Sequence, residues 1–123
     1  MAEPLFDVRQ GRRTYTASGA ITAGMFVNPH STAGQVVASP TQIAPCMLAV
    51  TDAVNGADVE VVPIVRGAEY RVLCGATSIS AGAELAIGAT SDVGKAITYA
   101  AGVKVGRALE AAASGGLMKI IAY

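Results

Sequence analysis

The feature that most constrains this chain is a short-range apolar alternation that glycine interrupts every few residues. Apolar side chains fall on every second position at Val59 and Val61, and again at Tyr70, Val72 and Cys74. This spacing is typical of a half-buried β-strand. Further short strands are expected at residues 25–27, 35–38, 47–51, 84–87, 96–99 and 117–122. Many short strands with regular turn signals predict an all-β barrel or sandwich.

The segments without this alternation predict the remaining organisation. Residues 108–113 are rich in alanine and could be helical, although a helix this short is marginal on its own. Residues 40–45 begin and end with proline and are expected to form a loop. Residues 1–13 have no apolar face of their own and read as an extended N-terminal arm. The expected organisation is this arm followed by a single β-barrel domain over residues 14–123.

A faint internal repeat runs through the predicted barrel. The segment Ile21-Thr22-Ala23-Gly24 returns as Ile79-Ser80-Ala81-Gly82, and residues 34–37 have a counterpart at residues 94–97. Each half then reads as strands separated by glycine turns. We interpret the halves as two similar β units folded together. A duplication and a shared strand–turn rhythm without duplication both explain the pattern.

Charge is sparse and balanced. Only 15% of the residues are charged, with nine basic and nine acidic side chains, against a usual fraction of about 25%. Few charges leave little to oppose self-association, so part of the surface is expected to contact other chains. A monomer with a surface rich in alanine and glycine is the alternative. The balanced charge also argues against a nucleic-acid partner, which would need clustered basic residues.

The location of the protein follows from what its segments lack. No stretch of about twenty apolar residues is present, so no membrane partner is expected. The N-terminus does not have the layout of a signal peptide, which predicts synthesis in the cytosol. Cys46 and Cys74 are therefore expected to be reduced and buried.

Motifs for catalysis are missing from the sequence. His30 is the sole histidine, and two distant cysteines with one histidine make a poor zinc site. Asp52, Asn55 and Asp58 lack the spacing of a calcium loop and are better explained as turn residues. We expect no enzyme, no metal and no cofactor.

Several blocks, in order, resemble small bacteriophage capsid decoration proteins, also called cement proteins. The blocks are residues 19–27, 48–53, 56–61, 65–72, 79–85, 94–97, 105–109 and 117–122. The family usually has glycine followed by valine or alanine at the start of the repeated strand. Here the first copy has Cys46-Met47 while the second keeps Gly106, which puts the local turn in doubt.

The resemblance implies a small β-barrel of the β-tulip or β-clip type. It also implies a homotrimer on the outer surface of the expanded capsid, which clamps neighbouring major capsid subunits and needs no cofactor. Expected contacts with the capsid or with a neighbouring subunit lie in the arm, at Leu5, Phe6, Arg9, Arg12 and Arg13. The arm would add a strand to a capsid sheet edge or pack on its own trimer neighbour.

Two other functions remain open at the level of sequence. A β-clip carbohydrate-binding module resembles residues 79–85, although its few aromatic side chains are dispersed. A minor structural component of the tail or portal is the second, and it would assemble into a larger ring.

Overall fold

The computed structural model describes residues 12–39 and 44–123. Within these ranges the chain is all-β, with one short 3-10 helix, η1 (Thr90–Asp92), and no α-helix. The strands are β1 (Arg13–Ala17), β2 (Phe26–Pro29), β3 (Gln35–Ala38), β4 (Met47–Ala49), β5 (Asp58–Pro63), β6 (Glu69–Leu73), β7 (Glu84–Ile87), β8 (Ala96–Thr98), β9 (Gly106–Ala108) and β10 (Leu117–Ala122). The predicted all-β fold with a small barrel is confirmed.

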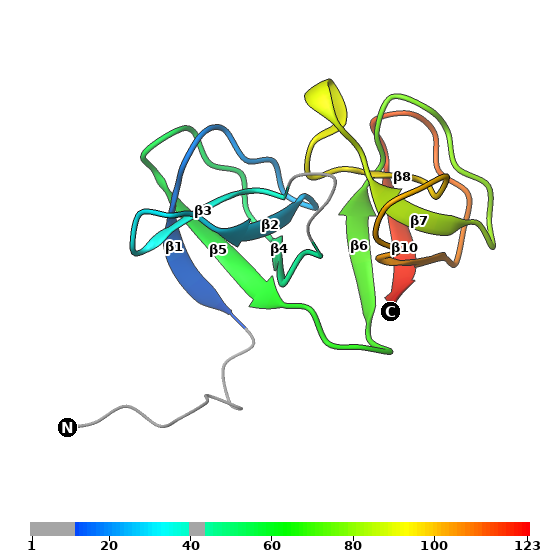
Figure 1. The fold of residues 1–123 in the computed structure, drawn as a ribbon, viewed down its shortest axis with the longest axis horizontal. Helices are drawn as coiled ribbons and strands as arrows, with labels where there is room; N and C mark the ends of the chain where they lie inside the picture. Colours follow the sequence, from blue (N-terminus) through cyan, green and yellow to red (C-terminus); the bar gives the residue numbers. More distant parts are fainter. Residues whose placement is uncertain (1–11, 40–43) are drawn as a thin grey trace.

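The first five strands form a closed barrel in the order β1-β3-β2-β4-β5 (Figure 1). β1 closes it by pairing antiparallel with β5 and parallel with β3. Alternate side chains of β5 point inward, so Val59 and Val61 are fully buried with Val27 and Val36. The alternation seen in the sequence therefore marks the inner face of this barrel.

The last five strands form a second sheet in the order β6-β10-β9-β7-β8. A parallel bridge between Cys74 and Ala96 brings its two edge strands together. This bridge corresponds to the parallel pairing of Ala17 with Val36 in the first unit. If β6 to β10 are matched in order with β1 to β5, the strands follow one another around both units in the same order. The repeated sequence segments therefore occupy equivalent positions in the two units.

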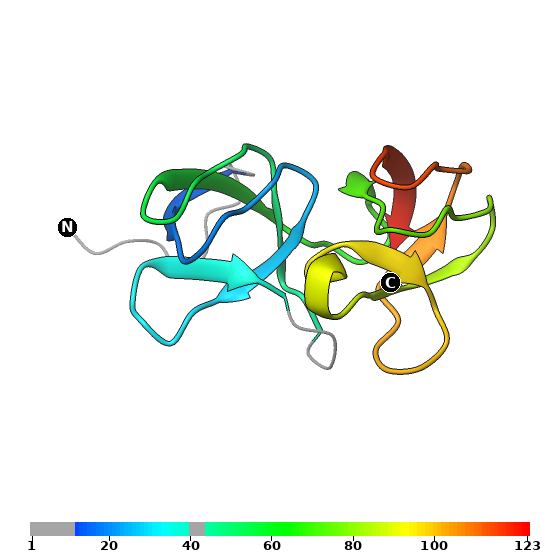
Figure 2. The same ribbon diagram turned by 90° about the horizontal axis from the view of Figure 1, so that it is seen from above.

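The two units lie side by side and share a hydrophobic core (Figure 2). Phe26 and Leu48 lie on the outside of the first barrel and pack among Leu85, Met118 and Ile120 of the second unit. The strands of residues 14–123 are thus divided between two joined units instead of following one barrel wall.

Three local expectations differ from the structure. β1 begins at Arg13, inside the expected arm, because Arg13 to Thr16 pair with β5. The helical alternative for residues 108–113 is wrong, since Ala108 pairs with Ile120 and Ala112 forms a bridge with Ile79. Both cysteines are free, but only Cys74 is buried, because Cys46 precedes β4 on the surface.

Two glycine turns make backbone hydrogen bonds between the units. The carbonyl of Gly94 accepts a hydrogen bond from the Phe26 amide at 2.7 Å, and its own amide donates to Ser39 at 3.1 Å. In return the carbonyl of Gly24 accepts from the amide of Leu73 at 2.9 Å. Gly94 has φ +76, and an added Cβ would lie 3.0 Å from the carbonyl oxygen of Phe26. Only glycine fits both this dihedral angle and this separation.

We expect Gly94→Ala to destabilise the protein more than Gly34→Ala. Gly34 occupies the equivalent turn of the first unit with φ +79, but an added Cβ there meets nothing within 4 Å. Gly34→Ala should cost about 1 kcal/mol of left-handed strain. Gly94→Ala adds overpacking between the units, about 1–3 kcal/mol more. Urea unfolding measures the difference, and equal costs would contradict the role of Gly94 as an inter-unit contact.

Candidate interaction groove

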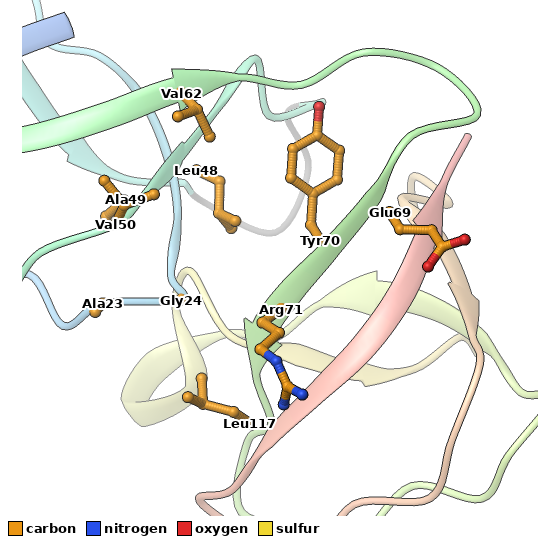
Figure 3. A pocket seen from close by; sticks show the side chains of 10 residues that line it. All are labelled: Ala23, Gly24, Leu48, Ala49, Val50, Val62, Glu69, Tyr70, Arg71 and Leu117. Atoms are coloured by element: carbon orange, nitrogen blue, oxygen red, sulfur yellow. The ribbon is translucent and has the colours of Figure 1, made fainter. Parts of the chain in front are cut away.

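A mostly apolar groove of about 340 Å³ lies between the two units. β6 and Leu117 form one side, and β4 and β5 of the first barrel form the other. Figure 3 shows Leu48, Val62 and Tyr70 around the same open space. Gly24, which is bonded to Leu73, lies at one end of the groove.

The side formed by β6 is a free sheet edge. Among the residues that the structure describes, β6 pairs only with β10. The Cys74 amide donates to Gly116, and the Ala122 amide donates to Ala68. Hydrogen-bonded positions alternate along an antiparallel pair, so the backbone groups of Glu69 and Arg71 point away from β10. No described residue hydrogen-bonds to these groups. The groove therefore combines an apolar wall with unpaired backbone donors and acceptors.

The opposite wall is the outer face of the first barrel. Leu48 pairs with Val62 in the β4–β5 ladder, so both side chains lie on the same face. Val62 is half-buried, and it packs against the shared core from the groove side. The wall is apolar because Leu48 and Val62 belong to the contact between the two units. The same two residues also line the groove.

Tyr70 holds the linker that joins β5 to β6. Its hydroxyl donates to the carbonyl of Pro63 at 3.0 Å and accepts a hydrogen bond from the amide of Val65 at 2.7 Å. The ring meanwhile packs against the shared core. The Tyr70 side chain thus lines the groove and also holds the linker in place.

Tyr70→Phe should lower the free energy of unfolding by about 1 kcal/mol, because it removes two hydrogen bonds that water partly replaces. The amide of Val65 should also exchange its hydrogen faster. Tyr15→Phe is the matched control, since the Tyr15 hydroxyl has no partner among the described residues. Unchanged exchange at Val65 in Tyr70→Phe would show that the hydroxyl does not hold the linker.

A second polar group lies on the surface of the second unit. Glu84 accepts a hydrogen bond from the Tyr123 hydroxyl at 3.1 Å and forms an ion pair with Lys104 at 3.2 Å. Arg107 donates to the same hydroxyl at 3.2 Å, and Lys104 lies 5.0 Å from the ring centre of Tyr99. The hydrogen bond from Lys104, followed by that from Tyr123, lowers the pKa of Glu84.

A carboxyl group with a lowered folded-state pKa adds stability above its unfolded pKa, and that stability disappears as the pH falls through the folded pKa. The contribution of Glu84 should be small and sensitive to salt, because the group is exposed. NMR titration should show the pKa of Glu84 rising toward its ordinary value in Lys104→Met. Lys95→Met, outside this group, should leave the value unchanged. A Glu84 pKa that does not respond to Lys104→Met would contradict the assigned cause.

The predicted contact residues fall only partly within the described chain. Arg12 forms an exposed ion pair with Glu60 at 3.1 Å, and Arg13 is an exposed residue of β1. Leu5, Phe6 and Arg9 lie outside the described residues. Arg12 therefore binds its own barrel here, and its role in contacts with other chains remains a prediction.

The acidic loop has a structural role in the first unit. Asp52 accepts a hydrogen bond from the amide of Ala23 at 2.7 Å, and Asn55 accepts from the amide of Gly19 at 2.8 Å. Both side chains tie the β4–β5 loop to the β1–β2 loop. Across residues 12–39 and 44–123, no three potential metal ligands come together. The same residues contain no helix long and apolar enough to cross a membrane.

Sequence reasoning missed the groove. Its partners come from distant segments, and apolar residues such as Leu48 and Val62 carry no sign of lying outside a barrel. One signal was present: the charged residues Glu69 and Arg71 flank Tyr70 at the start of a predicted strand, and edge strands often carry charges.

Comparison with known proteins shows the fold without showing a family. No protein-family model matches the chain, and no curated protein matches it in sequence. A solved structure, the N base of the head fiber gp8.5 in bacteriophage phi29, is similar with a TM-score of 0.73. The likeness covers 91% of this chain and 92% of the other at 20% identity. It therefore includes both β units and establishes that the two proteins share a fold.

Proposed function

We propose that this protein is a structural component of a bacteriophage virion that binds the outer surface of the expanded head. The likeness to a phage head fiber base over 91% of the chain supports this most directly. In the proposed role, a homotrimer clamps neighbouring major capsid subunits and stabilises the shell. The blocks that resemble capsid decoration proteins support the same location from the sequence.

The two-unit fold suits such a role physically. The shared core joins the units into one body, so contacts made by either unit restrain the other. Binding of one small subunit would be weak, but linked subunits bind with much higher avidity, because later contacts become intramolecular. A trimer of this chain would therefore bind to a shell that presents repeated sites at matching spacing.

A second candidate is the base of a fiber that projects from the head. The solved structure of similar fold is itself described as such a base. A base and a cement protein bind the same shell, but they differ in their effect on it. A cement protein raises the resistance of the shell, whereas a fiber base need only hold the projecting part.

Co-sedimentation with expanded, undecorated heads of the source phage tests the proposal. We expect binding that saturates at a fixed copy number and heads that survive higher temperature or chelation. Unexpanded heads are the control and should bind less. Saturable binding without added resistance would favour the fiber base. Folded protein that fails to bind expanded heads would overturn both roles.

A further inference from the structure

The free edge of β6 is a site built for strand addition. The backbone groups of Glu69 and Arg71 face the groove without a partner among the described residues. Unpaired groups of this kind are a template for another extended chain. The bond between Leu73 and Gly24 closes the edge at one end, so an added strand has room only beside the first part of β6.

We propose that this edge receives the N-terminal segment of a second copy of the chain, with residues 6–9 added as a strand antiparallel to β6. In this register Arg9 lies opposite Glu69 and Asp7 lies opposite Arg71. Residues directly opposite in an antiparallel pair have their side chains on the same face. Each charged residue at the edge thereby meets a residue of opposite charge.

The same register places the apolar residues of the segment toward the groove. Phe6 and Val8 alternate with the charged positions, so they lie opposite Val72 and Tyr70 on the other face of the added strand. That face of β6 carries the side chains that pack on the shared core. A strand added parallel to β6 would instead place Asp7 beside Glu69 and Arg9 beside Arg71. Both pairs would then bring like charges together, which disfavours the parallel direction.

A second copy is favoured as donor over the same chain. β1 lies on the side of β5 away from β4, and its first residue, Arg13, pairs with Val61 of β5. Only residues 10 and 11 separate Arg12 from Arg9, and three steps along the chain span at most about 11 Å. The segment would have to pass over β5 and then enter the groove within that length. The segment of a neighbouring copy has no such limit.

This exchange has a consequence for assembly. Donor and acceptor are different parts of the chain, so the contact is heterologous, and it closes into a ring when the rotation allows. A ring of three copies agrees with the proposed trimer. The inference rests on the self-association in the proposed function, but it does not depend on binding to the capsid.

Charge reversal in the full-length protein tests the register. Arg71→Glu and Asp7→Arg should each weaken self-association at least tenfold in sedimentation analysis, and the double variant should recover most of the loss. Lys119→Glu is the matched control, because Lys119 lies beside Arg71 on the same face but one strand farther from the edge. Wild-type protein that stays monomeric, or a double variant without recovery, would overturn the proposal.

Disulfide trapping separates exchange between copies from docking within one chain. Asp7→Cys and Arg71→Cys are made separately in full-length Cys46→Ser protein, which leaves only the buried Cys74. Opposite residues of a hydrogen-bonded pair have Cα atoms about 5.5 Å apart, within disulfide range. Mixing the two variants should give a crosslinked heterodimer, whereas Asp7→Cys mixed with Lys119→Cys should not. A crosslink that forms only within a chain carrying both Asp7→Cys and Arg71→Cys would refute the exchange.

The two proposals fail in different ways. An oligomer with the predicted crosslink that does not bind heads would remove the virion role and leave the exchange intact. Saturable binding of a wild-type monomer to heads would remove the exchange between copies and leave the virion role intact.

Discussion

The close approach of two glycine turns is the contact on which the rest of the structure depends. Gly94 enters the first unit between Phe26 and Ser39, and Gly24 reaches the second unit at Leu73. Each turn donates or accepts backbone hydrogen bonds that a side chain at that position would disrupt. The equivalent turns, at Gly34 for Gly94 and at Gly82 for Gly24, face open space. The same kind of turn therefore only connects two strands in one unit, whereas in the other it also joins the two units.

The joint explains why the core is shared. The outer positions Phe26 and Leu48 can be apolar because the second unit covers them. Burying such side chains stabilises the pair of units by roughly 1.5–3 kcal/mol for each large apolar residue. Small units bury a smaller share of their surface, so the shared core adds burial that neither unit has alone.

The joint also creates the groove. The first barrel is closed by β1, but in the second unit β6 meets β8 only at one bridge. The first unit covers one end of the β6 edge through Gly24, and the outward backbone groups of Glu69 and Arg71 have no partner within residues 12–39 and 44–123. The proposed exchange completes this edge with a strand of matching charge. It thus links the architecture of one subunit to the proposed self-association.

Local pattern was enough to predict much of this molecule. The alternation around Val59 and Val72 predicted strands and a barrel, because side chains two apart along a strand share one face. The repeat of Ile21 to Gly24 at Ile79 to Gly82 predicted two similar units, and equivalent turns are found there. The N-terminal strand β1 and the short β9 were missed, since β1 offers only two alternate apolar residues, Tyr15 and Ala17, and β9 is only three residues long.

The sequence by itself determined the strands, the turns and the two similar halves, because these depend on residues that are neighbours along the chain. Only the tertiary structure decided which outer faces are covered, that Gly24 and Gly94 join the units, and that no described strand pairs with the outer edge of β6. These features depend on contacts between residues far apart in the chain. The identity of an apolar residue does not show whether its side chain faces the interior of its own unit or the surface of a neighbouring unit.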